Sequence, residues 1–279
     1  MTETLEPGLH DIPEAEYHAD PVPGGSASSS TLRKMLAPSA PAVVQWEREN
    51  DTWKPQYDFG SVAHKLLLGR GAEVHIVNRE VWNTNEVKAE VKAAREAGLI
   101  PIKASDYRRA QEVEKAVRRH PIAHALLEPG SGMPERTIIW RDAETGQWCR
   151  AMLDWLSLLP GQQPVIVDVK TTGSGIDRRS ITNTIAKFGY HQQDAFYRTA
   201  VESLGYDRPW FFFVFITSTP PHQVAVVSLD DISVVAGHEK NRTALALWAE
   251  CRRTGEWPGV STDLETITLP NWAITEAYA

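Results

Sequence analysis

Three consecutive β-rich runs near the middle of the chain constrain its fold more than any other feature. They cover residues 136–141, 148–158 and 165–170, and turn-forming stretches at 142–146 and at Pro160-Gly161 separate them. Short connections of this kind join antiparallel neighbours, because a parallel neighbour needs a longer crossover. We therefore predict a three-stranded antiparallel meander at the centre of the protein.

Helical patterns lie on both sides of this meander. A single long helix is predicted at 181–204, with Gly189 as a mild interruption, and Asp230 is predicted to cap a last helix that runs to about Arg253. The other predicted elements are helices at 31–36, 42–49, 59–68, 85–97 and 105–127, strands at 210–217 and 223–229, and an irregular tail at 261–279.

These elements together predict an α/β (α+β) fold, in which helices flank one mixed central sheet. The first 30 residues are rich in Pro, Gly, Ser and acidic residues, so we expect them to form an extended arm. Residues 1–58 are predicted to be this arm and short helices packed on the core, and residues 59–279 to be the main domain of one globular unit.

The composition is that of a soluble globular protein, with 42% hydrophobic and 23% charged residues. No apolar run is long enough to span a membrane, and Met1–His10 lacks the basic start and apolar core of a secretory signal. A cytoplasmic location is therefore predicted. The two cysteines, Cys149 and Cys251, are expected to be reduced thiols, and two thiols are too few to hold zinc or an iron–sulfur cluster by themselves.

The net charge of −7 argues against a protein coated with basic residues for nucleic-acid binding. It does not argue against an enzyme, because a catalytic groove needs only local positive potential. Cations that cluster in sequence near the candidate catalytic segments could supply this potential, although each one alone is more often a solvated surface charge; they are Arg33, Lys34, Lys65, Arg70, Arg178, Arg179, Lys187 and Arg198.

The third β-rich run ends in an acid and an amine. Asp168 and Lys170 are two residues apart on a strand, so their side chains share one face. In phosphodiester hydrolysis, such a carboxylate can hold a divalent metal, while the ammonium positions water or stabilises charge on the phosphate. For so short a pattern, a surface salt bridge at a strand end is the more common alternative.

The preceding run places Asp154 among apolar residues. Two carboxylates that converge from adjacent strands repel each other, and a hard divalent cation relieves this repulsion. The alternative is that Asp154 pairs with Arg150 or Arg141. Glu135, just before the first run, is a further candidate acid, although an exposed strand-edge glutamate is common.

Two helical pairs complete the candidate site. Gly60 and His64 are four residues apart, so the histidine could be a third ligand while the glycine lets another backbone or DNA approach closely. Gln193 and Tyr197 share a face of a later helix and suit a phosphate or a water molecule. The alternatives are an ordinary helical histidine, a core tyrosine and a half-exposed glutamine.

The order Gly60-x-x-x-His64, Asp154, Asp168-x-Lys170 and Gln193-x-x-x-Tyr197 resembles the RecE-like branch of the PD-(D/E)xK nuclease superfamily. This branch contains the exodeoxyribonuclease VIII-type exonucleases of phages and prophages. Similar stretches run from one end of the chain to the other, at 8–12, 16–18, 167–172, 190–197, 257–259 and 269–273. The chain departs from the RecE pattern at Met152-Leu153-Asp154, where an Arg-Pro-Asp run is expected.

The resemblance implies a restriction-endonuclease-like core and a set of site residues. His64, Asp154, Asp168 and the backbone carbonyl of Val169 would bind Mg²⁺ or Mn²⁺. Lys170 would act on the attacking water, and Gln193 and Tyr197 would line the metal–phosphate site.

The implied activity is metal-dependent exonucleolytic degradation of linear double-stranded DNA in the 5′-to-3′ direction. The 3′ single strand would pass to an annealing protein during phage-type recombination, and the enzyme could be a homo-oligomer. A structure-specific endonuclease on the same fold and a catalytically silent DNA-binding recombination module are the alternatives. The chain contains neither a Gly-x-x-x-x-Gly-Lys-Ser/Thr phosphate loop nor a Gly-x-Ser-x-Gly nucleophile elbow.

Overall fold

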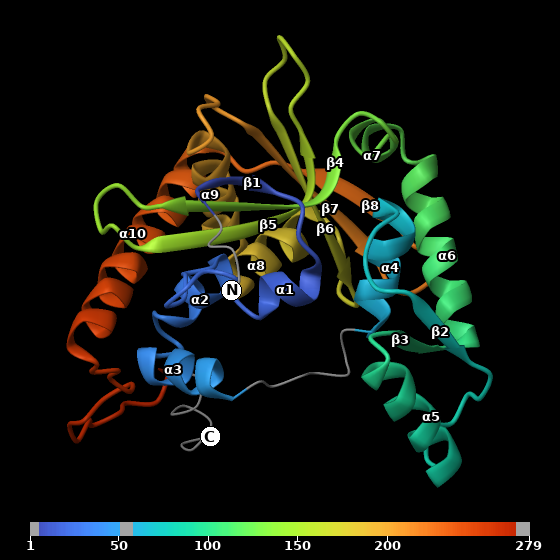
Figure 1. Cartoon of the computed structure of the whole chain (residues 1–279), viewed down its shortest axis with the longest axis horizontal. Helices are drawn as coiled ribbons and strands as arrows, with labels where there is room; N and C mark the ends of the chain where they lie inside the picture. Colours follow the sequence, from blue (N-terminus) through green and yellow to red (C-terminus); the bar gives the residue numbers. More distant parts are fainter. Residues whose placement is uncertain (1–5, 51–57, 272–279) are drawn as a thin grey trace.

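A six-stranded mixed sheet forms the centre of the protein in the computed structural model, which describes residues 6–50 and 58–271 (Figure 1). Strands β4, β5 and β6 pair antiparallel, so the predicted meander is confirmed, whereas β7 is parallel to β6 and antiparallel to β8. The order across the sheet is β1 (Gly8–His10), β4 (Met133–Arg141), β5 (Trp148–Ser157), β6 (Val165–Thr172), β7 (Trp210–Thr217) and β8 (Val224–Val227).

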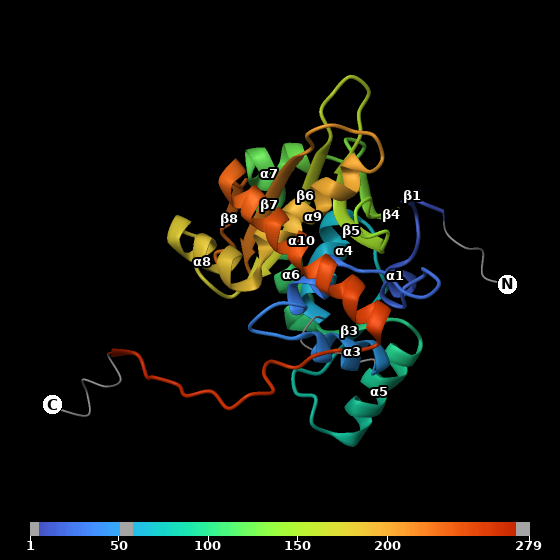
Figure 2. The same ribbon diagram turned by 90° about the vertical axis from the view of Figure 1, so that its left-hand side faces the viewer.

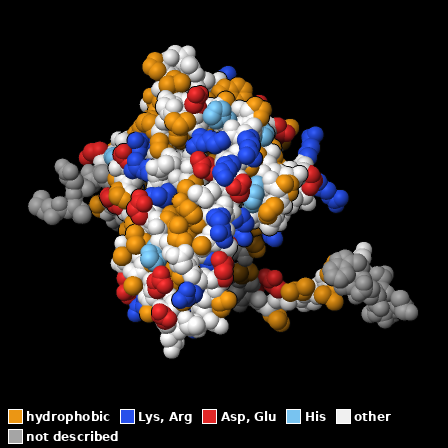
Figure 3. All heavy atoms as spheres, turned by 90° about the vertical axis from the view of Figure 1, so that its right-hand side faces the viewer, with side chains coloured by type: hydrophobic (Ala, Val, Ile, Leu, Met, Phe, Trp, Pro, Cys, Tyr) orange, Lys and Arg blue, Asp and Glu red, His pale blue; other side chains and the backbone are white. Residues whose placement is uncertain are grey.

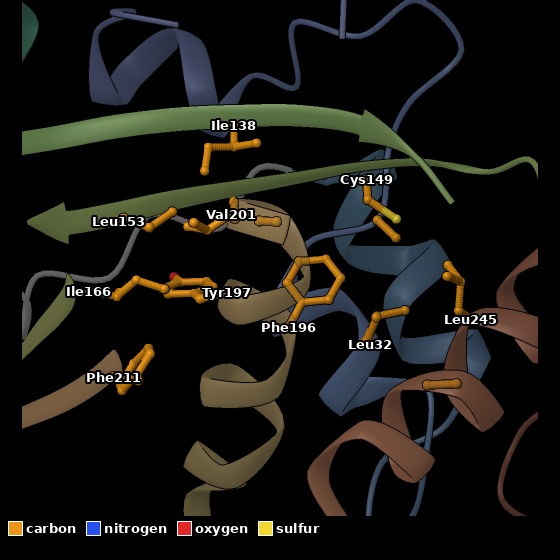
Figure 4. Packing of buried hydrophobic residues seen from close by; sticks show 14 of the residues in the cluster. Leu32, Ile138, Cys149, Leu153, Ile166, Phe196, Tyr197, Val201, Phe211 and Leu245 are labelled. Carbon is orange, nitrogen blue, oxygen red and sulfur yellow. The ribbon is translucent and has the colours of Figure 1, made fainter. Parts of the chain in front are cut away.

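Helices cover both faces of this sheet because its strands alternate their side chains between two apolar cores. In β6, Ile166 belongs to one core and Val167 to the other. The first core, part of which Figure 4 shows, lies against α2 (Ser29–Lys34), α8 (Arg178–Phe188), α9 (Tyr190–Glu202) and α10 (Asp231–Thr254). The second lies against α4 (Asp58–Leu68), α6 (Ala104–Arg119) and α7 (Pro121–Leu126).

The crossover between the parallel strands β6 and β7 consists of two helices instead of the one that we predicted for 181–204. Gly189 adopts a left-handed conformation with φ 66°, which ends α8 and allows α9 to begin at Tyr190. The predicted helix at 105–127 is also divided. Pro121 begins α7, and the residue before it, His120, has the extended backbone that a following proline favours.

The N-terminal segment is not the extended arm that we expected. Its residues Gly8–His10 form β1, which pairs antiparallel with β4 at the edge of the sheet, and α1 (Glu14–His18) follows. Tyr17 anchors α1 with a buried ring. Helix α3 (Pro41–Glu49) lies where a short helix was predicted at 42–49. The proposed domain boundary at 58/59 adjoins residues 51–57, which lie outside the described part of the chain.

A small βαβ unit was missed by the sequence analysis. Strands β2 (Val74–Val77) and β3 (Ile100–Lys103) pair in parallel, and α5 (Asn85–Glu96) connects them at the lower right of Figure 1. A cluster of Val77, Val87 and Val91 joins the helix to the first of these strands.

Just beyond α10, Trp257 packs against Trp248 and the Ala42 N–H donates to the carbonyl oxygen of Pro258. After this contact the chain runs away from the body without regular structure over most of residues 259–271, as Figure 2 shows. This agrees with the irregular tail predicted from residue 261, whose last part, 272–279, lies outside the described residues. Both cysteines are free and buried. Within the described ranges, no helix combines the length and apolar character needed to cross a membrane.

Charges of both signs are mixed on the face of the molecule that carries α6 (Figure 3). Along this helix, basic residues pair with acidic ones one turn away, as in Arg109–Asp106, Lys115–Glu112 and Arg118–Glu114. This face is therefore not a continuous basic surface, in keeping with the overall negative charge.

Candidate active site

The candidate site lies where strands β5 and β6 part. Residues 155–157 of β5 pair with 165–167 of β6, whereas β6 pairs with β7 along its full length. Beyond that point, the backbone groups of Val169 are bonded by side chains: its N–H donates to Asp154 Oδ2 over 2.7 Å, and its carbonyl oxygen lies 2.9 Å from His64 Nε2. The predicted site residues His64 and Asp154 therefore meet at the backbone of a third, Val169.

Helix α4 positions His64 through its apolar side. Val62, Ala63 and Leu67 are buried, and the imidazole is left to face β6. A carbonyl oxygen only accepts hydrogen bonds, so Nε2 carries a proton and donates it, and Nδ1 is the ring nitrogen available to a metal. Nδ1 lies 3.8 Å from Asp154 Oδ2, too far for a hydrogen bond.

Asp168 and Lys170 lie on one face of β6, as strand alternation predicts, and form an ion pair of 2.7 Å. The aspartate is only 1% exposed. Burial raises the pKa of Asp168 to about 6, and the charge of Asp154 adds to this effect, while Lys170 opposes it. Burial by itself lowers the pKa of Lys170, but the two aspartates outweigh it, so the net shift is upward. Lys170 is therefore a permanent cation at the site.

Gln193 belongs to the site, while Tyr197 lies behind it. Gln193 Nε2 donates to Asp168 Oδ1 over 2.7 Å. The ring of Tyr197 lies in the apolar core with Ile166 and Phe211 (Figure 4). The Tyr197 side chain is buried, and Gln193, Asp168 and Asp154 all influence its hydroxyl, so its place at the phosphate site stays a prediction.

Two glutamates add negative charge beside Asp154. The pairs Pro134–Trp155 and Arg136–Leu153 put Glu135 across from Asp154 on the neighbouring strand. Burial raises the pKa of Glu135, and Glu14 and Asp154 raise it further.

Glu14 was missed because its segment was expected to be extended. A sequence signal did exist: Tyr17 lies three residues further on, at the spacing of one helical turn, and Tyr17 is the residue that α1 buries.

The proposed salt-bridge alternatives do not describe these aspartates. Arg150 pairs with Asp20 over 2.7 Å, and Arg141 stacks on Trp148, so neither arginine neutralises Asp154. The Asp168–Lys170 pair exists, but its carboxylate is buried, unlike a surface bridge.

Gly60 is not a point of close backbone approach. A Cβ atom built there would meet only Thr171 Oγ1, at an ordinary distance of 3.7 Å. The suggestion that this glycine lets another backbone come close is therefore wrong, and its relation to DNA stays a prediction.

The candidate phosphate-binding cations divide into two groups. Lys34 pairs with Glu47, Lys65 with Glu73, Arg70 with Asp11, and Arg198 with the buried Asp194. These four side chains are engaged in holding the protein together. The other four remain candidates for contact with DNA: Arg178, Arg179 and Lys187 on α8, and Arg33 on α2, which also donates a hydrogen bond to the carbonyl oxygen of Phe188.

The donor set fits a hard divalent cation in its chemistry. Carboxylates and a backbone carbonyl are ligands that Mg²⁺ and Mn²⁺ prefer, while an imidazole is more typical of later transition metals. Ligands of an octahedral ion at about 2.1 Å lie about 3.0 Å apart when adjacent and about 4.2 Å apart when opposite. His64 Nδ1 and Asp154 Oδ2 are 3.8 Å apart, so these two side chains would shift slightly to share one ion. No three His, Cys, Asp or Glu side chains among the described residues are already gathered around one point, and Asp168 is bonded to Lys170 and Gln193 instead.

Comparison with known proteins gives an independent view of the fold. The profile of a family described as "PDDEXK-like domain of unknown function (DUF3799)" matches residues 28–270. The crystal structure of a presumed exonuclease from Eubacterium rectale superposes with a TM-score of 0.63 at 15% identity, over 95% of this chain and 98% of that one. The predicted fold class is therefore confirmed.

A phage-related exonuclease from Haemophilus somnus 129PT is more distant. It is 12% identical, with a TM-score of 0.35 over 83% of this chain and 96% of that chain. The comparison with curated proteins gave no match.

Proposed function

The chain belongs to the PDDEXK-like family DUF3799, and from this premise we propose that it is a metal-dependent deoxyribonuclease. The observation that carries the proposal is the meeting of His64 and Asp154 at the backbone of Val169, the residue between Asp168 and Lys170. A carboxylate pair, a partly buried ammonium and a backbone carbonyl that no neighbouring strand pairs with suit phosphodiester hydrolysis.

His64, Asp154, Asp168 and the carbonyl oxygen of Val169 would hold Mg²⁺ or Mn²⁺. The bound ion would supply Lewis-acid polarisation of the phosphate and a water of lowered pKa. Lys170 would orient the attacking water and stabilise charge on the scissile phosphate, because its ammonium stays protonated beside two carboxylates.

Gln193 and Tyr197 would position the metal-binding carboxylate of Asp168 from the core side of the sheet. Gln193 would fix the rotamer of Asp168 through its 2.7 Å hydrogen bond, and Tyr197 would act through Gln193. Glu135, across the strands from Asp154, would add negative potential that attracts a cation.

The proposed substrate is linear double-stranded DNA, degraded from its 5′ ends. Support for this polarity comes from the RecE-like order of the motifs and from nothing in the geometry of the site. The same resemblance supports a role in phage-type recombination, in which the 3′ single strand passes to an annealing protein and the enzyme assembles as a homo-oligomer.

The proposal is tested with one plasmid in linear and in closed circular form, labelled at either end when linear. With Mg²⁺, the wild type should release 5′-terminal label first and leave the circle intact, while EDTA or Asp168→Asn should stop the release. Cutting of the circle at the same rate would favour an endonuclease on the same fold. DNA binding with no cleavage of either form would favour the silent module.

A further inference from the structure

A pair of aromatic rings leads from Lys170 to the surface. The ammonium of Lys170 lies 4.6 Å from the ring centroid of Tyr190, and the ring of Phe188 stacks on Tyr190 at 5.7 Å and 26°. Phe188 is 52% exposed, although a phenylalanine on a soluble protein is usually buried. We call Phe188 and Tyr190 the aromatic ledge.

The ledge is held in place from both sides. Tyr190 stacks on Phe213 at 5.9 Å, which ties it to strand β7 beneath. Arg33 of α2 donates a hydrogen bond of 2.8 Å from Nη1 to the carbonyl oxygen of Phe188, the last residue of α8. This bond satisfies a helix-terminal carbonyl, and the positive charge suits the negative end of the helix dipole.

The glycine between the two rings makes this arrangement possible. Gly189 turns the chain in a left-handed conformation, and a Cβ atom there would come within 3.0 Å of Arg33 Cδ. The exposed ring of Phe188 is therefore part of a fixed turn.

Cations border the ledge. Lys187 Nζ lies 5.4 Å from the Phe188 ring, and the Arg33 guanidinium lies 5.9 Å from the Tyr190 ring. A π-face edged by positive charge is the arrangement that binds unpaired nucleic acid, because bases stack on the ring while phosphates meet the cations. An apolar protein surface would not pair with the charges of Lys187 and Arg33, so a protein partner of that kind fits this site less well.

We propose that the aromatic ledge is a subsite on which an unpaired nucleobase stacks, next to the phosphate that Lys170 contacts. The proposal rests on the proposed nuclease function. The contacts of 4.6 and 5.7 Å that link Lys170, Tyr190 and Phe188 put the exposed ring within reach of a base adjoining that phosphate. The ledge would thus hold the frayed end of the strand during cleavage.

The test measures binding of a duplex that carries 2-aminopurine at its 5′ terminus, in an Asp154→Asn background that prevents cleavage. Stacking on the ledge should quench the fluorescence of the base. Phe188→Ala should restore it and weaken binding by about 5- to 100-fold, the range for loss of one base–aromatic stack. Phe188→Trp should recover both the quench and the affinity.

Trp210→Ala is the matched control. Trp210 is 51% exposed and stacks on Phe212 at 6.2 Å, but it lies at the start of β7, where it pairs with Val165 at the end of β6 remote from Lys170. This variant should bind like its parent. If Phe188→Ala bound the duplex within twofold of the parent and quenched the fluorescence equally, the stacking subsite would be refuted while the nuclease proposal would stand. A parent protein that binds no DNA end would overturn the nuclease proposal, and the ledge with it.

Discussion

Val169 organises the candidate site although its own side chain is buried in the apolar core. Its N–H and carbonyl groups stand where β5 no longer pairs with β6, so Asp154 and His64 bond to them. Asp168 and Lys170 could be predicted from the sequence because strand alternation alone puts them on one face. The Gln193–Asp168 bond and the burial of Tyr197 could not, since they depend on how α9 packs against the sheet.

Proton competition at Asp168 predicts how metal affinity depends on pH. The pKa of this carboxyl is raised to about 6 in the metal-free protein, and a protonated carboxyl does not bind a cation. Affinity for Mn²⁺ should therefore fall between pH 7 and pH 5, approaching about tenfold per unit below the pKa. Isothermal titration calorimetry checks this, and His64→Gln should keep the dependence. Equal affinities at pH 7.5 and pH 5.0 would refute it.

Replacing Arg198 with alanine should lower the free energy of unfolding much more than replacing Arg179 with alanine. Arg198 pairs with Asp194, which is fully buried and whose pKa burial raises to about 6. Arg198→Ala leaves that carboxylate uncompensated, so we expect a loss of about 3 kcal/mol in the free energy of unfolding. The loss should be larger at pH 8 than at pH 5, because protonation of Asp194 relieves it.

The exposed Arg179→Ala should change stability by less than about 0.5 kcal/mol. Urea unfolding at both pH values compares the two variants. If both variants lost a similar amount of unfolding free energy, the Arg198–Asp194 pair would not stabilise the protein as proposed.

At the scale of elements, the crossover helices illustrate what local sequence leaves open. A glycine within a helical pattern is often tolerated, so the interruption at Gly189 could be recognised but its consequence could not. The outcome depends on Arg33, from a distant helix, which occupies the space above the turn. The break at Pro121 is different, because a proline restricts its predecessor by local sterics.

Helices α9 and α10 cross at Gly237, where a Cβ atom would lie 2.1 Å from the carbonyl oxygen of His191. Alanine favours the helix by about 1 kcal/mol, but this gain is smaller than the cost of forcing two backbones apart. Gly237→Ala should therefore destabilise the protein by about 2 kcal/mol net. Gly259→Ala, where a Cβ meets nothing within 4 Å, serves as the control in urea unfolding. An unchanged midpoint for Gly237→Ala would contradict this packing.

At the scale of the whole molecule, the alternation of helical and β patterns was sufficient to predict a mixed sheet flanked by helices, and the fold is confirmed. The missed strands β1, β2 and β3 have three or four residues each. The sequence around these three strands shows no usable periodicity, whereas β8, which also has four residues, lies within a longer β-rich run at 223–229 and was predicted. Glu14 was missed for another reason: its segment was expected to be extended, although the Glu14–Tyr17 spacing was a sequence signal for the short helix α1.

Lys170 and its neighbouring carboxylates are proposed to perform metal-dependent cleavage of DNA. Single-turnover cleavage of an end-labelled linear duplex with Mg²⁺ tests it most directly, with Lys170→Met compared against Lys115→Met, a surface lysine paired with Glu112. Lys170→Met should lower the rate by about 10²- to 10³-fold while it still binds Mn²⁺, and Lys115→Met should cut at the wild-type rate. Cleavage by Lys170→Met at the wild-type rate, or wild-type cleavage in EDTA, would contradict the claim.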